Sequence, residues 1–195
     1  MLRIYCAGPL FNPSERAEMD SIASTLELSG FSTFLPHRDG LEFAQIKPAL
    51  EQCGASPSEA ARIIDRAIFA LDTYQLLRCC DVVVANLNGR VPDEGTIVEA
   101  TLAWHSGKPL VLYKTDVRSM LGGSDNPMVT GLGDFESIND LSALPAAVER
   151  VVAIHSSEKL SETMEFGASI AALRDKNDSV CAVAAVLYQN KHPKK

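Results

Sequence analysis

The sequence alternates short apolar runs with longer amphipathic stretches, a pattern typical of an α/β domain. Four runs are short, rich in β-branched or aromatic residues and bounded by polar or turn-forming residues: 2–7, 31–35, 82–84 and 110–113. Runs of this kind suit strands that are buried on both faces of a parallel sheet. A weaker run at 135–138 is expected to form a last, short strand.

The stretches between these runs carry apolar residues at helical spacing. They predict helices over 13–29, 58–77, 96–106 and 141–154 and, towards the carboxyl terminus, over 158–174 and 179–189. Residues 36–40 read as a polar loop, and 41–57 hold a further short helical piece. We therefore expect one domain over 1–155 and a helical extension over 156–195 that packs on it.

Composition narrows the function to the chemistry of small ligands. The net charge of −7 argues against nucleic acid and anionic membrane surfaces. No apolar run approaches about 20 residues and no leader pattern is visible, so neither a membrane span nor a signal peptide is expected. Five cysteines without CxxC spacing indicate reduced thiols and a cytoplasmic protein.

The sequence offers no recognised pattern for a metal or a nucleotide cofactor. Four histidines are scattered without ligand spacing, so we expect no metal site. Neither GxGxxG nor GxxxxGK[ST] is present, and no cofactor is expected.

The segment from Asp81 to Pro109 joins a buried strand, an acidic loop and a helix start. Asp93, Glu94 and Glu99 place three carboxylates at that helix start. Ligands of parallel sheets bind beyond the carboxyl ends of the strands, where this loop lies. The helix dipole favours an ionised Glu99, which could then act as a nucleophile. The structural alternative is that Glu99 only completes a capping box with Thr96.

Two further acidic residues lie at the same predicted edge. Asp72 is near the end of its helix and can face the ligand edge, whereas Asp65 is expected to face solvent. Asp39 leaves the second strand with His37 and Arg38 and is a candidate for contact with a base, although a solvated loop explains it equally well.

Several short motifs, in order, resemble the nucleoside 2-deoxyribosyltransferase family. They are Ile4 to Phe11, Asp72, Cys80 to Ala85, Pro92 to Glu99, Gly107-Lys108-Pro109 and Asp125 to Met128. The resemblance implies a flavodoxin-like three-layer fold with a five-stranded parallel sheet. It also implies a cofactor-free pentosyltransferase that exchanges the base of a 2′-deoxynucleoside with a free nucleobase, as in purine and pyrimidine salvage.

The resemblance also assigns roles to individual residues. Glu99 matches the nucleophile, Asp72 the acid/base residue and Tyr5 the tyrosine beside the nucleophile. Asp93 and Asn126 match residues that hold sugar hydroxyls. The Asn126 loop is lent by a neighbouring subunit, which implies a homodimer or a larger homo-oligomer. Further substrate contacts are expected within the same motifs, at these positions: Gly8, Pro9, Gly95 and Met128.

The chemistry of glycosidic-bond cleavage independently requires two carboxyls. One stabilises an oxocarbenium-like transition state and traps it as a glycosyl ester, while the other protonates the departing base. Retention by double displacement places the two about 5 Å apart. Glu99 and Asp72, on separate helices, are the candidates. The negative charge of Asp93 argues for free nucleosides over nucleotides.

Two alternatives remain open from the sequence. The protein can be a hydrolase of the N-glycosidic bond, acting on deoxynucleosides or nucleotides, in which case free sugar appears without an acceptor base. It can also be a noncatalytic nucleoside-binding module in which Glu99 is only a helix cap.

Overall fold

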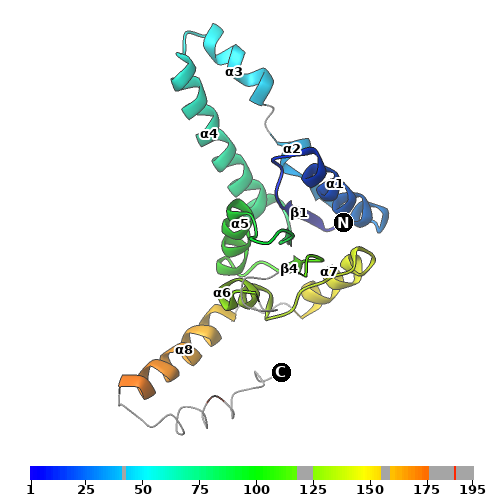
Figure 1. The fold of residues 1–195 in the computed structure, drawn as a ribbon, viewed down its shortest axis with the longest axis vertical. Coiled ribbons are helices and arrows are strands. Elements are labelled where there is room, and N and C mark those ends of the chain that lie inside the picture. The colour runs from blue at the N-terminus through cyan, green and yellow to red at the C-terminus, as the bar shows by residue number, and fades with distance from the viewer. Residues whose placement is uncertain (41–42, 118–124, 155–158, 176–186, 188–195) are drawn as a thin grey trace. The chain divides into compact units, whose positions relative to one another are not determined.

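The computed structural model describes residues 1–40, 43–117, 125–154, 159–175 and 187 (Figure 1). The chain divides into two compact units, Met1–His155 and Ser156–Lys195. Within the second unit, α8 (Lys159–Asp175) is the predicted helix over 158–174. The helix predicted over 179–189 lies outside the described residues, apart from Leu187. How the extension packs stays a prediction.

The first unit is built on a parallel sheet of four strands in the order β2-β1-β3-β4. The strands are β1 (Arg3–Ala7), β2 (Ser32–Phe34), β3 (Val82–Asn86) and β4 (Leu110–Tyr113). Ile4 pairs with Val82 and Val83 with Leu110, so β1 and β3 are the central strands. After β1 the chain runs to β2 at one edge of the sheet, and after β3 it runs to β4 at the other edge. The carboxyl ends of β1 and β3 therefore form a topological switch point, which is where ligands of open α/β sheets bind.

The predicted α/β fold is confirmed, but the expected fifth strand is wrong. Ile138 alone reaches the sheet, through an isolated parallel bridge to Tyr113. Asp134 and Phe135 adopt left-handed conformations, with φ of 56° and 63°. Such residues cannot continue an extended strand. The run at 135–138 therefore contributes only the bridge at Ile138 to the sheet.

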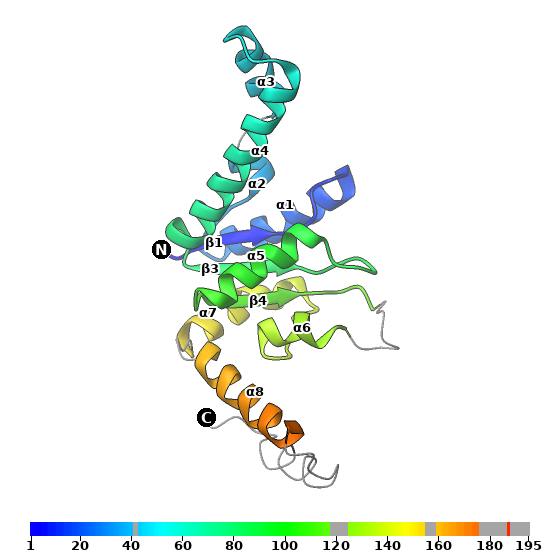
Figure 2. The same cartoon turned by 90° about the vertical axis from the view of Figure 1, so that its left-hand side faces the viewer.

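Helices cover both faces of the sheet (Figures 1 and 2). Helices α1 (Pro13–Leu28) and α7 (Leu144–Ala153) pack on one face, with Ile4, Val82 and Val84. The end of α4 (Pro57–Tyr74), the π-helical turn η1 (Gln75–Cys79) and α5 (Glu94–His105) belong to the other face. Because side chains alternate along a strand, Ile4 and Cys6 face α1 whereas Tyr5 and Ala7 face α5.

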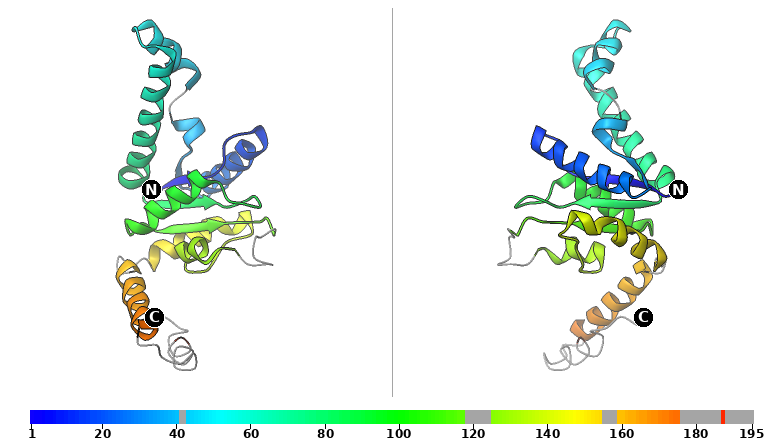
Figure 3. Two further views of the ribbon diagram at one scale, coloured as in Figure 1. Left: turned by 60° about the vertical axis from the view of Figure 1, so that its left-hand side comes forward. Right: turned by 90° about the vertical axis from the view of Figure 1, so that its right-hand side faces the viewer.

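The remaining elements are short or peripheral. Residues 36–39, predicted as a loop, form the helical turn α2 (Pro36–Asp39). Helix α3 (Phe43–Gln52) packs on α4, and Figure 3 shows both extending away from the sheet. The others are α6 (Pro127–Thr130), η2 (Gly131–Gly133) and η3 (Leu141–Ala143). Among the described residues, no helix has both the length and the apolar content to cross a bilayer.

Candidate active site

Glu99 and Tyr5 form the centre of the candidate site. The Tyr5 hydroxyl donates a hydrogen bond of 2.5 Å to Glu99 Oε1, across 94 residues of sequence. Tyr5 is fully buried and stacks on Phe34, with ring centroids 5.5 Å apart. On α5, Glu99 lies one turn from Thr96 and from Ala103, which are both buried. The glutamate therefore points towards the sheet.

The start of α5 tests the capping-box interpretation of Glu99. The N-cap is Asp93, whose Oδ2 accepts hydrogen bonds from the Thr96 amide at 2.7 Å and from the Thr96 hydroxyl at 2.9 Å. The structural alternative, in which Thr96 is the N-cap and Glu99 completes a capping box with it, is therefore wrong. The carboxyl group of Glu99 is held by the tyrosine instead.

Asp72 lies in the last turn of α4, immediately before the π-helical turn η1. π-helical turns are rare and frequently occur at functional sites. The charge of Asp72 raises the pKa of both Glu99 and Tyr5, so Asp72 lies within electrostatic reach of the hydrogen-bonded pair. Tyr5, Asp72 and Glu99, predicted from separate parts of the sequence, are thus brought together.

Burial dominates the titration of these groups. It raises the pKa of Glu99 to about 7, against the lowering by the Tyr5 hydrogen bond and with further raising by Asp72 and Asp93. Burial also raises the pKa of Asp72 to about 6. The pKa of Tyr5 is raised by burial and by Glu99, so the phenol stays protonated. The helix dipole was expected to keep Glu99 ionised, but desolvation is the larger effect.

A cleft of about 500 Å³ opens at the carboxyl ends of β1, β3 and β4. Its lining combines apolar side chains with carboxylates: Pro9, Phe11, Glu15, Glu18, Asn88, Gly89, Val91, Asp93, Thr115 and Asp116. Asp93 connects this cleft with Glu99, because it lines the cleft and its charge raises the pKa of Glu99. The cleft volume suits a small molecule.

Several lining residues were missed by sequence reasoning. Asn88 lies two residues after the end of β3, and its Oδ1 accepts hydrogen bonds from the amides of Thr115 at 2.7 Å and Asp116 at 2.9 Å. Its Nδ2 donates to Glu18 of α1. Asn88 therefore ties together three segments around the cleft. The sequence signal that could have identified them is their position, since both Asn88 and Thr115 come shortly after the ends of predicted strands.

Gly8, Pro9 and Gly95 come from the motifs at 4–11 and 92–99 and lie beside the cleft or the N-cap of α5. Pro9 lines the cleft. A Cβ on Gly8 would approach Met19 Sδ to 2.1 Å, so Gly8 allows α1 to pack closely against the end of β1. Gly95 is the second residue of α5, where a Cβ would meet Asp93 Oδ2 at 3.1 Å.

Asn126 and Met128 are exposed and are held by local contacts. Asn126 caps α6 by accepting a hydrogen bond from the Met128 amide at 2.9 Å. The Met128 side chain is exposed, with 81% of the residue accessible. Neither residue has a described contact with Glu99, so the structure does not bring them into the Tyr5–Glu99 cluster within one chain.

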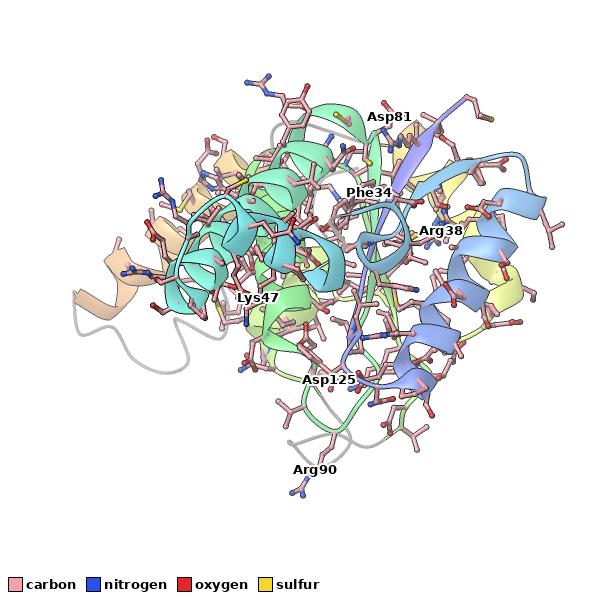
Figure 4. The ribbon with its side chains drawn as sticks, turned by 90° about the horizontal axis from the view of Figure 1, so that it is seen from above. Phe34, Arg38, Lys47, Asp81, Arg90 and Asp125 are labelled. Carbon is pink, nitrogen blue, oxygen red and sulfur yellow. The ribbon has the colours of Figure 1, made fainter. Side chains whose placement is uncertain are left out.

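Asp39 belongs to a separate network at the edge of the sheet. It accepts a hydrogen bond from the Leu35 amide at 2.8 Å and pairs with Arg38, which also pairs with Glu27 (Arg38 and Phe34 are labelled in Figure 4). Burial opposes ionisation of Asp39, but Arg38 and the Leu35 amide lower its pKa. These contacts indicate a structural role in the helical turn α2.

In the part of the chain that the structure describes, no three His, Cys, Asp or Glu side chains are arranged to hold a metal ion.

Comparisons with solved structures place the fold among known ones. A conserved protein from Enterococcus faecalis V583 is similar, with a TM-score of 0.59 and 22% identity, over 77% of this chain and 98% of that chain. At that identity, the likeness shows the fold. A 2-deoxyribosyltransferase from Bacillus psychrosaccharolyticus aligns with a TM-score of 0.45 and 22% identity, over 74% of this chain and 96% of that one. A CMP N-glycosidase from Clostridium botulinum aligns with a TM-score of 0.42 and 16% identity, over 75% and 97%.

Comparisons of sequence are more specific. No curated protein gives a significant match. A family model described as nucleoside 2-deoxyribosyltransferase matches residues 4–171, which include Tyr5, Asp72, Glu99 and the whole cleft lining. Because this match spans well over half of the sequence, the chain belongs to the nucleoside 2-deoxyribosyltransferase family.

Proposed function

We propose that the protein exchanges the base of a 2′-deoxynucleoside with a free nucleobase, using Glu99 as a nucleophile and Asp72 as an acid/base catalyst. One observation carries the proposal. The hydrogen bond between Tyr5 and Glu99 holds the glutamate towards the sheet, in reach of the charge of Asp72 and away from the helix cap. Family membership supports the reaction class.

In the first half of the reaction, Glu99 attacks C1′ of the sugar as the N-glycosidic bond breaks. The electron pair of that bond goes to the base nitrogen, which takes a proton from Asp72. The product is a free base and a 2-deoxyribosyl ester of Glu99. Tyr5 donates its hydrogen bond to Glu99 throughout and so fixes the carboxylate in position.

In the second half, a nitrogen of the incoming base attacks C1′ and displaces Glu99 as a carboxylate. The acceptor nitrogen gives its proton to Asp72, which restores the starting protonation state. A 2-deoxy sugar lacks the electron-withdrawing 2′-hydroxyl, so its cation forms readily with only these two carboxyls. The proposed reaction therefore needs no cofactor.

The raised pKa values fit a pair of carboxyls that shares one proton. The pair binds one proton between about pH 6 and 7, and this proton lies mostly on Glu99 because the pKa of Glu99 is the higher. The reactive form, with the proton on Asp72 and the negative charge on Glu99, is the minor one and reaches its largest share in the same range. Fully protonated sites lack the nucleophile, and fully ionised sites lack the acid. The proposal therefore gives kcat/KM a maximum in this range, with a fall on both sides.

The cleft supports a substrate without a phosphate. Among its described lining residues, four carry carboxylates and none is lysine or arginine. An anionic 5′-phosphate in the cleft would be repelled by these negative charges. We therefore propose free 2′-deoxynucleosides as substrates, held in part by Asp93.

The exposed positions of Asn126 and Met128 support a site shared between subunits. We propose a homodimer or larger homo-oligomer in which this segment completes the site of a neighbour. Base exchange would serve the salvage of purine and pyrimidine nucleosides in the cytoplasm.

The test is to incubate the protein with deoxyinosine, with and without free adenine, and to quantify deoxyadenosine, hypoxanthine and deoxyribose. Transfer predicts deoxyadenosine and faster loss of deoxyinosine when adenine is present. Equal release of hypoxanthine and deoxyribose in both reactions would make the protein a hydrolase. Binding without either product would make it a noncatalytic module.

A further inference from the structure

Lys114 follows β4 directly and is buried, with 6% of its side chain exposed. Its Nζ donates a hydrogen bond to Asp125 Oδ1 and forms an ion pair with it. A lysine is seldom buried to this extent, because desolvation of the ammonium group is costly unless the charge is paired. The pair therefore needs an explanation beyond packing.

The backbone of Lys114 makes a second contact with the same stretch of chain. Its amide donates to the carbonyl of Ile138 at 2.8 Å, next to the bridge between Tyr113 and Ile138. Lys114 thus holds both ends of the segment from Asp125 to Ile138, one through its side chain and the other through its backbone. Only the first contact depends on the identity of residue 114.

The end that the side chain holds is the one that carries Asn126 and Met128 (Asp125 is labelled in Figure 4). Asn126 follows Asp125 directly, and its carbonyl accepts hydrogen bonds from the amides of Val129 at 2.8 Å and Thr130 at 3.1 Å. Asn126 and Met128 are exposed, so local bonds and the neighbouring ion pair hold the start of the segment, whereas Val129 packs against the core on the α5 face. Loss of the ion pair would release the start of the segment.

We infer that Lys114 is a positioning residue, whose ion pair with Asp125 places the Asn126–Met128 segment for contact with the substrate. This inference rests on the proposed function, since it requires the segment to hold the sugar. Lys114 acts through Asn126, in whichever subunit Asn126 completes the site. The inference therefore predicts that loss of the ion pair weakens substrate binding and leaves the chemistry of Asp72 and Glu99 intact.

The test compares Lys114→Met with Lys108→Met. Both variants lose a lysine charge beside β4 and keep most of the side-chain volume. Lys108 lies before the other end of the strand and donates to the Cys80 carbonyl, so it controls for loss of a charge next to the same strand. Lys114→Arg retains the charge and serves as the rescue variant.

Two measurements are made on each variant. Hydrogen exchange of the amides at 128–130 reports the position of the segment without any need for activity. Steady-state base exchange reports KM and kcat separately. For Lys114→Met we expect hydrogen exchange of these amides to be about tenfold faster and KM for base exchange to rise about tenfold. The value of kcat should stay within about twofold of the wild type. Lys108→Met should match the wild type in both, and Lys114→Arg should recover most of the loss.

An unchanged hydrogen-exchange rate in Lys114→Met would overturn the inference, because the segment would not depend on the ion pair. Faster hydrogen exchange with an unchanged KM would overturn the inference too, because the segment would then not bind substrate. If the wild type exchanges no base at all, the proposed function fails and the substrate role of Lys114 fails with it. The hydrogen-exchange comparison would still show whether Lys114 anchors the segment, so the two failures are distinguishable.

Discussion

On one face of the sheet, α1 and α7 cover the strands with apolar side chains such as Met19, Ile22 and Leu144. On the other face, α5 packs on β1 and β3, and the Tyr5 hydroxyl of β1 lies beside Glu99. Adjacent residues of one strand, Ile4 and Tyr5, thus face different environments. Desolvated acids reduce stability, so the α5 face gives up stability that the α1 face retains. The difference supports the proposal that the α5 face is the functional one.

The largest expected effect is the loss of activity when Glu99 is replaced. Glu99→Ala should lower kcat for base exchange by at least about a thousandfold, because the variant lacks the proposed nucleophile that forms the glycosyl ester. Thr101→Ala on the exposed side of the same helix is the control, and it should retain wild-type kcat. Similar rates for Glu99→Ala and the control would remove the functional distinction between the two faces.

The next effect concerns the acid. Asp72→Asn should lower kcat by about 10²- to 10⁴-fold for natural deoxynucleosides, because the departing base is no longer protonated. A 2-deoxyriboside with p-nitrophenolate as leaving group needs no proton and should react much closer to the wild-type rate. Asp65→Asn, on the exposed side of α4, should leave both rates unchanged. Equal losses on both substrates would show that Asp72 is not the acid.

A smaller effect should appear in the pH dependence of stability. The pKa of Glu99 rises from 4.5 to about 7 on folding, so the folded state binds the proton more tightly than the unfolded state. The stability that this proton contributes is fully present below about pH 4.5 and is lost as the pH rises through about 7. In Glu99→Gln this loss is absent. Between pH 5 and pH 8, the free energy of unfolding should fall by about 2 kcal/mol more in the wild type than in the variant.

Urea denaturation of both proteins at the two pH values measures this difference. Parallel pH dependences would mean that Glu99 is not desolvated in the folded protein.

The smallest effect belongs to the opposite face. Ile22→Val removes one methylene from the α1 face and should lower the free energy of unfolding by about 1 kcal/mol. The values of kcat and KM should not change, because Ile22 lies in the core cluster on the other side of β1 from Tyr5 and Glu99. Calorimetry measures the change in stability, and the base-exchange assay measures kcat and KM. A change in kcat of the folded variant would show that the two faces are coupled.

Elements with strong periodicity could be predicted from the sequence, and those decided by competition between local signals could not. β4 at Leu110–Tyr113 was predicted with its observed bounds, because a continuous apolar run between turn residues has few other interpretations. The predicted start of α5 at residue 96 was wrong, because Asp93 and Thr96 are both good N-caps and only the folded structure selects one of them. The missing fifth strand depends on left-handed conformations at Asp134 and Phe135, which the apolar pattern does not encode.

The site shows a similar division. Tyr5, Asp72 and Glu99 could be named from their motifs, but their meeting depends on pairing between distant strands, which local periodicity does not contain. The raised pKa of Glu99 could not be predicted, since the dipole of α5 is visible in the sequence and the burial of its side chain is not. The Asn88 cluster around the cleft likewise requires three chain segments to be placed together.

The most direct test of the role of Glu99 is to look for its covalent intermediate. The protein is mixed with deoxyinosine without an acceptor base, quenched in acid, digested and examined by mass spectrometry. The account predicts a peptide that carries one 2-deoxyribosyl group on Glu99, and loss of that group when adenine is added before the quench. Deoxyinosine turnover with no labelled peptide, or with the sugar on another residue, would contradict it.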